Sequence, residues 1–319
     1  MAVYTKITKD LLISFMKNYD LGEIKDFQGI EEGVENTNYK IISSKKIYIL
    51  TIFEKRVNED DLPFFINLLN HLSIKKIKCP KPIADNKGDY INRILNKPCV
   101  IMSFLSGQKI QLTKANHCFQ VGNNLAKIHK ATLDFNLNRK NNLNQQNWKA
   151  IFEKCKKIKD NKYIEIFEEI EKSLIYLDKN WPNKLPKGII HADVFRDNVF
   201  FINDKLTGVI DFYFACNDFY AYELAICINA WCFDQKINFS IKKFTSIIEG
   251  YQSLRNTTSQ EIEFLPILLQ GAAMRFLLTR LHDQLYHPAE AFVNPKDPLE
   301  YFEILKFHQN FKLPQINVN

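Results

Sequence analysis

The spacing of apolar residues changes once along this chain, close to Gly107, and that change limits the folds open to it. Before Gly107, short apolar runs bounded by turn residues are typical of strands. After it, apolar residues recur at helical intervals. The predicted strands are 38–44, 46–53, 90–95 and 98–107, and the helices that follow include 113–133 and 145–178. The pattern predicts an α+β fold, with a small antiparallel sheet followed by a mainly helical part.

The length of the chain indicates two lobes. A chain of 319 residues is too long for one small core, so we expect a lobe at 1–105 and a second at 106–319. The first lobe should also hold two helices, 8–19 and 60–72, the second with Pro63 in its first turn. Clefts between lobes are common ligand sites, so polar clusters near their junction are the first candidates for chemistry.

Composition excludes several classes of partner. Hydrophobic residues make up 46% and charged residues 25%, as in ordinary soluble proteins, and the net charge of +7 comes from scattered lysines. No basic block is interleaved with aromatic residues, which argues against nucleic acid. The start lacks the layout of a signal peptide, and no apolar run approaches the roughly 20 residues that span a bilayer. The seven cysteines lack zinc-site spacing. We therefore expect a cytoplasmic protein with reduced thiols that binds no membrane.

The richest polar stretch is GIIHADVFRDNVFF, residues 188–201. Asp193 is followed by Asn198, and Asp211 ends the apolar run LTGVID. A loop that leads into a β hairpin can bring these three side chains together. Two carboxylates and an amide oxygen are ligands that Mg²⁺ prefers, usually with waters and substrate phosphates. Asp and Asn are also common turn residues, but the joint spacing favours a site.

One carboxylate of this set can do chemistry instead. A carboxylate near a substrate hydroxyl orients it and accepts its proton during phosphoryl transfer. Protein kinases have the same order, with a catalytic Asp, a downstream Asn and then an Asp at a strand end. We assign the catalytic role to Asp193 and expect Asn198 and Asp211 to be the ligands of the metal ion. His191 is expected to brace the loop, while Asp197 fits a turn and Arg196 stays open.

Longer segments carry a resemblance that covers nearly the whole chain. GIEEGVENTNYKI, YILTIFEKR, GVIDFYFACNDFYAYELAICINAWCF and GAAMRFLLTRLHD, together with the polar stretch, resemble the aminoglycoside phosphotransferase and choline kinase superfamily, and within it the homoserine kinase branch. The resemblance implies a protein-kinase-like, two-lobed fold. It also implies phosphorylation of the L-homoserine hydroxyl in threonine biosynthesis, with ATP and Mg²⁺.

The resemblance also implies nucleotide-binding residues in the first lobe. A phosphate-covering loop would lie at 31–39, and a strand and hinge at 100–107 would meet adenine. The residues carried over are Gly33, Asn36, Thr37, Asn38, Met102, Ser103, Phe104 and Leu105. One position departs from the superfamily, because Thr51 stands where a Lys or Arg usually reaches the phosphates. Lys55, or Arg56 beside it, is the substitute we expect, and Asp61 is a candidate acidic partner on the following helix.

A zwitterionic acceptor needs an anion for its ammonium and a fork of donors for its carboxylate. The helical part offers both kinds of group. The candidates for the ammonium are Asp218, Tyr222 and Glu223, with Glu31 and Glu32 above them, and those for the carboxylate are Arg275 and Arg280. Each arginine has the alternative of a structural ion pair, because a buried guanidinium is costly unless paired.

Three other functions stay open from the residues alone. A related kinase would act on choline, ethanolamine or an aminoglycoside, and a choline site favours an aromatic cage. A non-catalytic nucleotide-binding module is favoured only by Thr51. A metal-dependent hydrolase using His191, Asp193 and Asp211 would have no use for the sheet lobe. The sequence leaves monomer and homodimer equally open.

Overall fold

The computed structural model describes residues 5–30, 36–54, 57–158, 161–287 and 295–316. The chain forms two compact units, and the smaller one is discontinuous in sequence. The first unit comprises Met1–Gly107, Phe135–Leu137 and Thr207–Tyr213, and the second comprises Gln108–Asp134, Asn138–Leu206 and Phe214–Asn319. The expected α+β class is confirmed.

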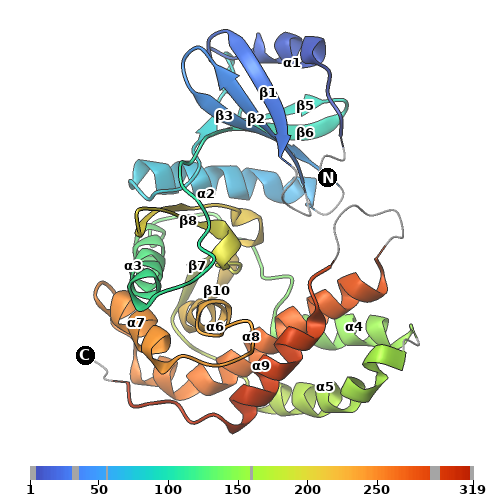
Figure 1. The fold of residues 1–319 in the computed structure, drawn as a ribbon, viewed down its shortest axis with the longest axis vertical. Coiled ribbons are helices and arrows are strands. Elements are labelled where there is room, and N and C mark those ends of the chain that lie inside the picture. The colour runs from blue at the N-terminus through green and yellow to red at the C-terminus, as the bar shows by residue number, and fades with distance from the viewer. Residues whose placement is uncertain (1–4, 31–35, 55–56, 159–160, 288–294, 317–319) are drawn as a thin grey trace. The chain divides into compact units, whose positions relative to one another are not determined.

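An antiparallel sheet dominates the first unit (Figure 1). Four of its strands match predicted ones, namely β2 (Asn36–Ser43), β3 (Ile47–Phe53), β5 (Ile91–Ile94) and β6 (Lys97–Ser103). Two more were not predicted, β1 (Ile24–Ile30) and β4 (Pro82–Ile83). The strand order is β1-β2-β3-β6-β4, and β5 pairs with the same β6.

The strand β1 escapes prediction because it is a polar edge strand. It reads IKDFQGI, only partly buried, and its register with β2 shifts between Ile24 and Asp26. Such an irregularity breaks the alternation of apolar and polar residues by which strands are recognised. An edge strand also buries less side-chain surface than a central one, so its composition is less constrained.

Helix α1 (Lys9–Met16) covers one face of this sheet. Its N-cap Thr8 accepts a hydrogen bond from the Leu11 amide at 3.3 Å. Leu12, which is fully buried, packs with Ile41 and Leu50 of the sheet in one apolar cluster. The second predicted helix is α2 (Leu62–Ile74), which follows the short η1 (Glu59–Asp61) and has Pro63 at its start.

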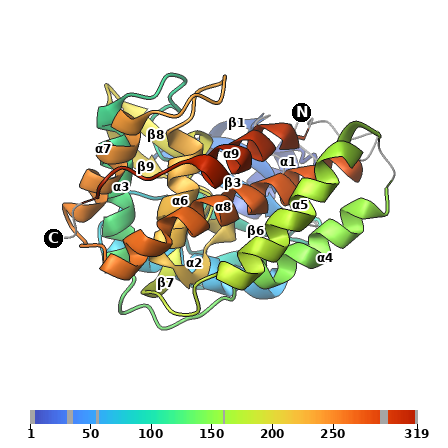
Figure 2. The same cartoon turned by 90° about the horizontal axis from the view of Figure 1, so that it is seen from below.

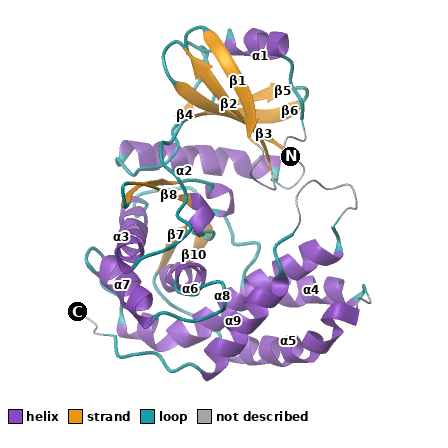
Figure 3. Ribbon diagram, viewed as in Figure 1, coloured by secondary structure: helices purple, strands orange, loops and turns teal. Residues whose placement is uncertain are grey.

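The second unit is mainly helical (Figure 3). Its helices are α3 (Ala115–Ala131), α4 (Gln145–Lys156), α5 (Asn161–Asn180), α6 (Tyr220–Trp231), α7 (Ile241–Gln252), α8 (Ser259–Leu285) and α9 (Pro298–Asn310). The short helices η2 (Arg196–Asn198) and η3 (Phe212–Phe214) both lie between α5 and α6 in the chain. Two small sheets interrupt this pattern: β7 (Lys187–Ile190) pairs with β10 (Cys216–Phe219), and β8 (Val199–Ile202) pairs with β9 (Lys205–Val209).

The pairing of β7 with β10 was not predicted. The helix α6 begins only at Tyr220, so it leaves out the two polar residues before Phe219. Asn217 and Asp218 lie instead in β10, where Asp218 pairs with Gly188. The two strands are short and distant in sequence, so no local periodicity reveals their pairing.

The long helix α8 forms the centre of the second unit, where it contacts α4, α5, α6 and α9 (Figure 2). The expectation that no segment has the length and composition of a membrane span is wrong for α8, the one described helix that meets both criteria. However, 67% of its apolar stretch is buried inside the protein. A core helix meets the same criteria, so α8 is explained by its packing.

Helix α9 carries a buried histidine, His308. Its ring Nε2 donates to the Asn229 side-chain oxygen at 2.7 Å, and its Nδ1 has no partner among the described residues. Burial among aromatic rings lowers the pKa of His308 to about 3. The imidazole therefore stays neutral in the folded protein at any pH above this value.

We expect the free energy of unfolding to fall by about 2 kcal/mol between pH 7 and pH 5 because of His308 alone. The unfolded chain binds a proton below about pH 6.5. In the folded chain His308 does not bind that proton until the pH falls to about 3, so stability is lost as the pH falls from about 6.5 toward 3. Urea unfolding at both pH values should show a smaller loss in His308→Gln, with His282→Gln, at a partly exposed position, as the unchanged control. An equal pH dependence in all three proteins would contradict the assignment.

Candidate functional site

The polar stretch folds as a tight loop after β7. Ala192 has a φ of 63°, a left-handed conformation in which non-glycine residues are uncommon. The Asn198 amide nitrogen, at the end of η2, donates to the Asp193 carbonyl at 2.9 Å and to its carboxylate Oδ2 at 3.0 Å. The structure thus brings Asp193 and Asn198 together, and the amide fixes the orientation of the carboxylate.

Three further groups hold the backbone of this loop. His191, which is fully buried, accepts a hydrogen bond at Nδ1 from the Asp193 amide at 3.2 Å, in keeping with the bracing role expected for it. The Trp231 indole donates to the Val194 carbonyl at 2.8 Å. The Arg275 guanidinium donates through Nη1 to the Ala192 carbonyl.

Glu223 of α6 is the main support of the loop, and the structure does not favour it as an acceptor-binding residue. Its fully buried carboxylate accepts hydrogen bonds from the backbone amides of His191 and, at 2.9 Å, Ala192. His129 of α3 lies 3.6 Å from the same carboxylate and is bonded at 2.8 Å to the Tyr251 hydroxyl. Burial raises the pKa of Glu223, but His129 and the loop amides outweigh it, so the pKa lies below its usual value.

Asp211 belongs to the first unit and follows β9 after one intervening residue, Ile210, rather than ending the strand as predicted. It has a φ of 66°, so the chain bends sharply at this carboxylate. The segment before it is fastened by the Val209 amide, which donates to the Lys78 carbonyl at 3.0 Å. A Cβ on Gly208 would lie 2.6 Å from that same carbonyl oxygen, so only glycine fits there.

Thr51, the residue that departs from the superfamily, is hydrogen-bonded to other side chains of the first unit. Its hydroxyl donates to the Asn38 side-chain oxygen at 2.8 Å and hydrogen-bonds to the Tyr213 hydroxyl. Tyr213 also contacts Phe53 and Phe65 edge to face, with ring centres 5.1 and 5.6 Å away. Burial, with the negative charge of Asp211 nearby, raises the pKa of Tyr213. Thr51 therefore links the strands of the sheet to the segment that carries Asp211.

The residues expected in the phosphate-covering loop, together with the basic pair expected to reach the phosphates, fall into two groups. Gly33, Glu31, Glu32, Lys55 and Arg56 lie outside the described residues. The others are part of β2. The Thr37 hydroxyl is fully buried and donates to Glu54 at 2.8 Å, which does not favour contact with a nucleotide. The Asn36 side-chain oxygen accepts from the Glu54 amide at 3.4 Å, and Asn38 binds Thr51.

The segment expected to meet adenine comprises the end of β6 and the residues just after it. Met102 is buried, and the Ser103 amide donates to the Lys81 carbonyl at 2.8 Å. The Phe104 amide donates to the Ile47 carbonyl at 3.4 Å. The Leu105 amide has no hydrogen-bond acceptor within the described part of the chain, so the hinge presents one backbone donor.

The remaining acceptor candidates differ in their surroundings. Asp218 accepts hydrogen bonds from Asn141 at 2.6 Å and from the next backbone amide at 2.7 Å. Burial raises the pKa of Asp218. Tyr222 is fully buried. Arg280 donates to the Glu300 carboxylate at 2.6 Å, so this guanidinium is used in a protein ion pair, the alternative left open for it.

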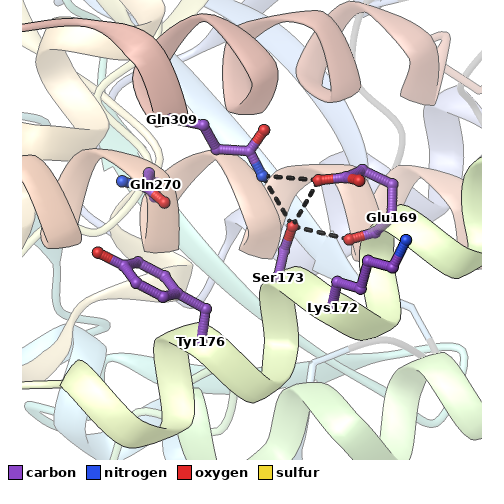
Figure 4. Close-up of a pocket in the computed structure, with 6 residues that line it drawn as sticks. All are labelled: Glu169, Lys172, Ser173, Tyr176, Gln270 and Gln309. Carbon is purple, nitrogen blue, oxygen red and sulfur yellow. Dashed lines mark hydrogen bonds between the residues drawn. The ribbon is translucent and has the colours of Figure 1, made fainter.

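The described residues offer no second candidate centre. They contain no group of three or more His, Cys, Asp or Glu side chains placed to hold a metal ion. A polar pocket of about 320 Å³ lies among helices α5, α8 and α9 (Figure 4). Three of its six lining side chains are hydrogen-bonded to one another, since Gln309 donates to Glu169 at 2.9 Å and to Ser173 at 3.0 Å. All seven cysteines are buried and free.

Solved structures with the same fold are small-molecule kinases. An amicoumacin kinase in complex with AMP-PNP, Ca²⁺ and Ami has a TM-score of 0.71 at 12% identity, covering 95% of this chain and 92% of that one. A choline kinase from Cryptosporidium parvum has a TM-score of 0.66 at 14% identity, covering 95% and 96%. At these identities the likeness establishes the kinase-like fold.

Sequence comparison is more specific. The model of the phosphotransferase enzyme family matches residues 26–256. A homoserine kinase from Parvibaculum lavamentivorans is 46% identical over 314 residues, 98% of both chains. Another, from Sinorhizobium medicae, is 45% identical over 309 residues, 97% of this chain and 95% of that one. The chain belongs to the phosphotransferase enzyme family and, within it, to the homoserine kinases.

Proposed function

We propose that the protein transfers the γ-phosphoryl group of ATP to the hydroxyl of L-homoserine, giving O-phospho-L-homoserine for threonine biosynthesis. The observation that carries this proposal is the loop in which Asn198 orients the Asp193 carboxylate. Near-full-length similarity to homoserine kinases supports the choice of acceptor. We further propose that it acts in the cytoplasm, as a monomer or homodimer, a location with which its free cysteines are compatible.

Asp193 is the catalytic base in this proposal. Its carboxylate accepts the proton of the homoserine hydroxyl as the oxygen forms a bond to the γ-phosphorus. The bond between that phosphorus and the oxygen of the departing ADP breaks in the same displacement. Because Asn198 binds one carboxylate oxygen, Oδ2, the other is left to meet the hydroxyl. Holding the two reactants in line supplies much of the rate.

Asn198 and Asp211 are the residues that would hold Mg²⁺. They fit the ion, because Asn198 uses its amide nitrogen on Asp193 and its amide oxygen accepts no hydrogen bond within the described residues. A carboxylate and an amide oxygen are hard ligands, and phosphates and waters complete such sites. The bound ion would neutralise charge on the phosphates.

The first unit supplies the adenine site in this proposal. The free Leu105 amide is suited to a ring nitrogen of adenine, with the buried Met102 behind it. Asn36 and Asn38 lie on the same face of β2 as each other, and Thr37 on the opposite one. Lys55 remains our candidate for the phosphates, since Thr51 is neutral and engaged in the sheet.

An acceptor screen tests the function directly. We expect ADP release with L-homoserine to exceed that with choline, ethanolamine, L-serine or an aminoglycoside by at least about 100-fold in kcat/KM, as hydrogen-bonded sites discriminate by such factors. Mass spectrometry should place the phosphate on the acceptor, which separates a kinase from a hydrolase. A preference for choline would mean that choline, and not L-homoserine, is the acceptor. Nucleotide binding without turnover of any acceptor would indicate a non-catalytic module.

A further inference from the structure

Two buried arginines on helix α8 differ in one respect. Arg280 is 8% exposed and has the Glu300 carboxylate at 2.6 Å. Arg275 is only 3% exposed, yet no carboxylate of the described residues forms an ion pair with it. Its Nη1 donates to the neutral carbonyl of Ala192, and its Nε has no hydrogen-bond partner. A buried guanidinium without an anion is costly, so this position calls for an anionic ligand.

The rings around Arg275 keep its guanidinium in place. The guanidinium carbon lies 4.2 Å from the ring centre of Phe276 and 5.5 Å from that of Phe214. These rings attract the cation through their faces but accept no hydrogen bond in its plane. The Nε donor is therefore left without an acceptor among the described residues, and a bidentate carboxylate is the partner that suits a guanidinium.

A second buried donor lies in the same neighbourhood. The Tyr222 hydroxyl of α6 is buried and has no hydrogen-bond partner in the described chain. Its ring contacts Trp181 edge to face at 5.6 Å. Tyr222 is within electrostatic range of both Arg275 and Asp218. Two unsatisfied buried donors on neighbouring helices are unusual, because native proteins pair nearly all such groups.

Asp218 supplies the opposite charge. It lies in β10, which pairs with the strand leading into the catalytic loop. Asn141 donates to one carboxylate oxygen at 2.6 Å, which orients the group. Asp218 and Arg275 are close enough to interact electrostatically, but they form no salt bridge with each other. Two opposite charges that interact without forming a salt bridge suit a ligand that carries both charges.

We infer that Arg275 and Tyr222 bind the α-carboxylate of the acceptor and that Asp218 binds its α-ammonium. The site would then select zwitterionic amino acids that carry a hydroxyl. This inference rests on the proposed function, and it assigns charge recognition to the same unit that holds the catalytic loop. Arg275 also donates a hydrogen bond to the carbonyl of Ala192, next to Asp193. The same side chain would therefore bind the acceptor carboxylate and hold the loop that carries the base.

Two analogues separate the two charges. Removing the carboxylate from homoserine gives 3-amino-1-propanol, and removing the ammonium gives 4-hydroxybutyrate. Dissociation constants of all three ligands are measured by titration calorimetry with ADP and Mg²⁺ present. For Arg275→Gln, we expect weaker binding of L-homoserine and 4-hydroxybutyrate by roughly 30-fold or more. Binding of 3-amino-1-propanol should change by less than about threefold, since it offers no carboxylate.

Asp218→Asn should give the mirror image. Binding of L-homoserine and 3-amino-1-propanol should weaken, and binding of 4-hydroxybutyrate should hold. The asparagine keeps one oxygen for the Asn141 amide but loses the acceptor of the Phe219 amide, so the fold of this variant is checked as well. Arg280→Gln is the matched control on the same helix. If it weakens binding, it should do so by the same factor for all three ligands.

The inference is overturned if Arg275→Gln weakens all three ligands by one factor, which is the result expected of a purely structural arginine. It is also overturned if neither analogue binds the unmodified protein. Circular dichroism checks that each variant folds, and Arg275→Lys, which retains the charge, should restore part of the affinity for the two carboxylates. Binding of homoserine in this charge-dependent way without any turnover would instead contradict the proposed function.

Discussion

Replacing Asp193 by Asn is expected to lower kcat for phosphorylation of L-homoserine by about 10²–10⁴-fold, the usual contribution of a positioned base. The amide cannot accept the hydroxyl proton. It retains an oxygen for the Asn198 amide, now 3.0 Å from the carboxylate, so the loop should keep its fold. The dissociation constant of ATP should change by less than about threefold. Coupled ADP release and calorimetry measure the two quantities.

The control for this variant is Asp197, which directly precedes Asn198 in the same short loop. Its carboxylate is exposed and pairs with Lys296 at 3.1 Å. Asp197→Asn should keep kcat within about twofold, because exposed ion pairs contribute little. A loss of less than tenfold in the Asp193 variant would show that Asp193 is not the base.

Replacing Glu223 by Ala should lower the free energy of unfolding by about 3–5 kcal/mol, a typical loss when one partner of a buried charged pair is removed. The change leaves the amides of His191 and Ala192 buried without an acceptor. It also removes the carboxylate beside His129. Urea unfolding measures the loss, and kcat should fall with it because the loop that carries Asp193 loses its support.

Glu223→Gln offers a graded comparison, since its single side-chain oxygen can serve only part of the loop. We expect its stability to lie between those of the unmodified protein and the Ala variant. Glu263→Ala, at an exposed position of α8, should change stability by less than about 0.5 kcal/mol. A loss below about 1 kcal/mol in Glu223→Ala would mean that the loop does not depend on this carboxylate.

The local parts of the site could be predicted from the sequence. Asp193 and Asn198 lie five positions apart in a polar stretch between apolar runs, so their proximity follows from chain connectivity. The role of Glu223 did not follow, because its partners come from a strand end and from a helix more than 90 residues earlier. No local pattern records such contacts.

The two arginines of α8 show the same limit. Arg275 and Arg280 have nearly the same apolar context in sequence, and both are buried. Only their tertiary neighbours separate them, since Glu300 of α9 reaches one and not the other. The central strands β2, β3 and β6 were predicted because buried strands are rich in apolar residues. The edge strand β1 and the distant pair of β7 with β10 lacked that signal.

The discontinuity of the first unit has a consequence for synthesis on the ribosome. Its sheet is complete by Gly107, but Tyr213, which covers Phe53 and Phe65 and bonds to Thr51, is made much later. Until then, these aromatic rings lack the cover that Tyr213 provides, and a nascent chain with exposed apolar surface is prone to aggregate. The N-terminal unit therefore cannot finish folding ahead of the rest. A fragment that ends at Gly107 should behave as an incomplete, chaperone-dependent chain.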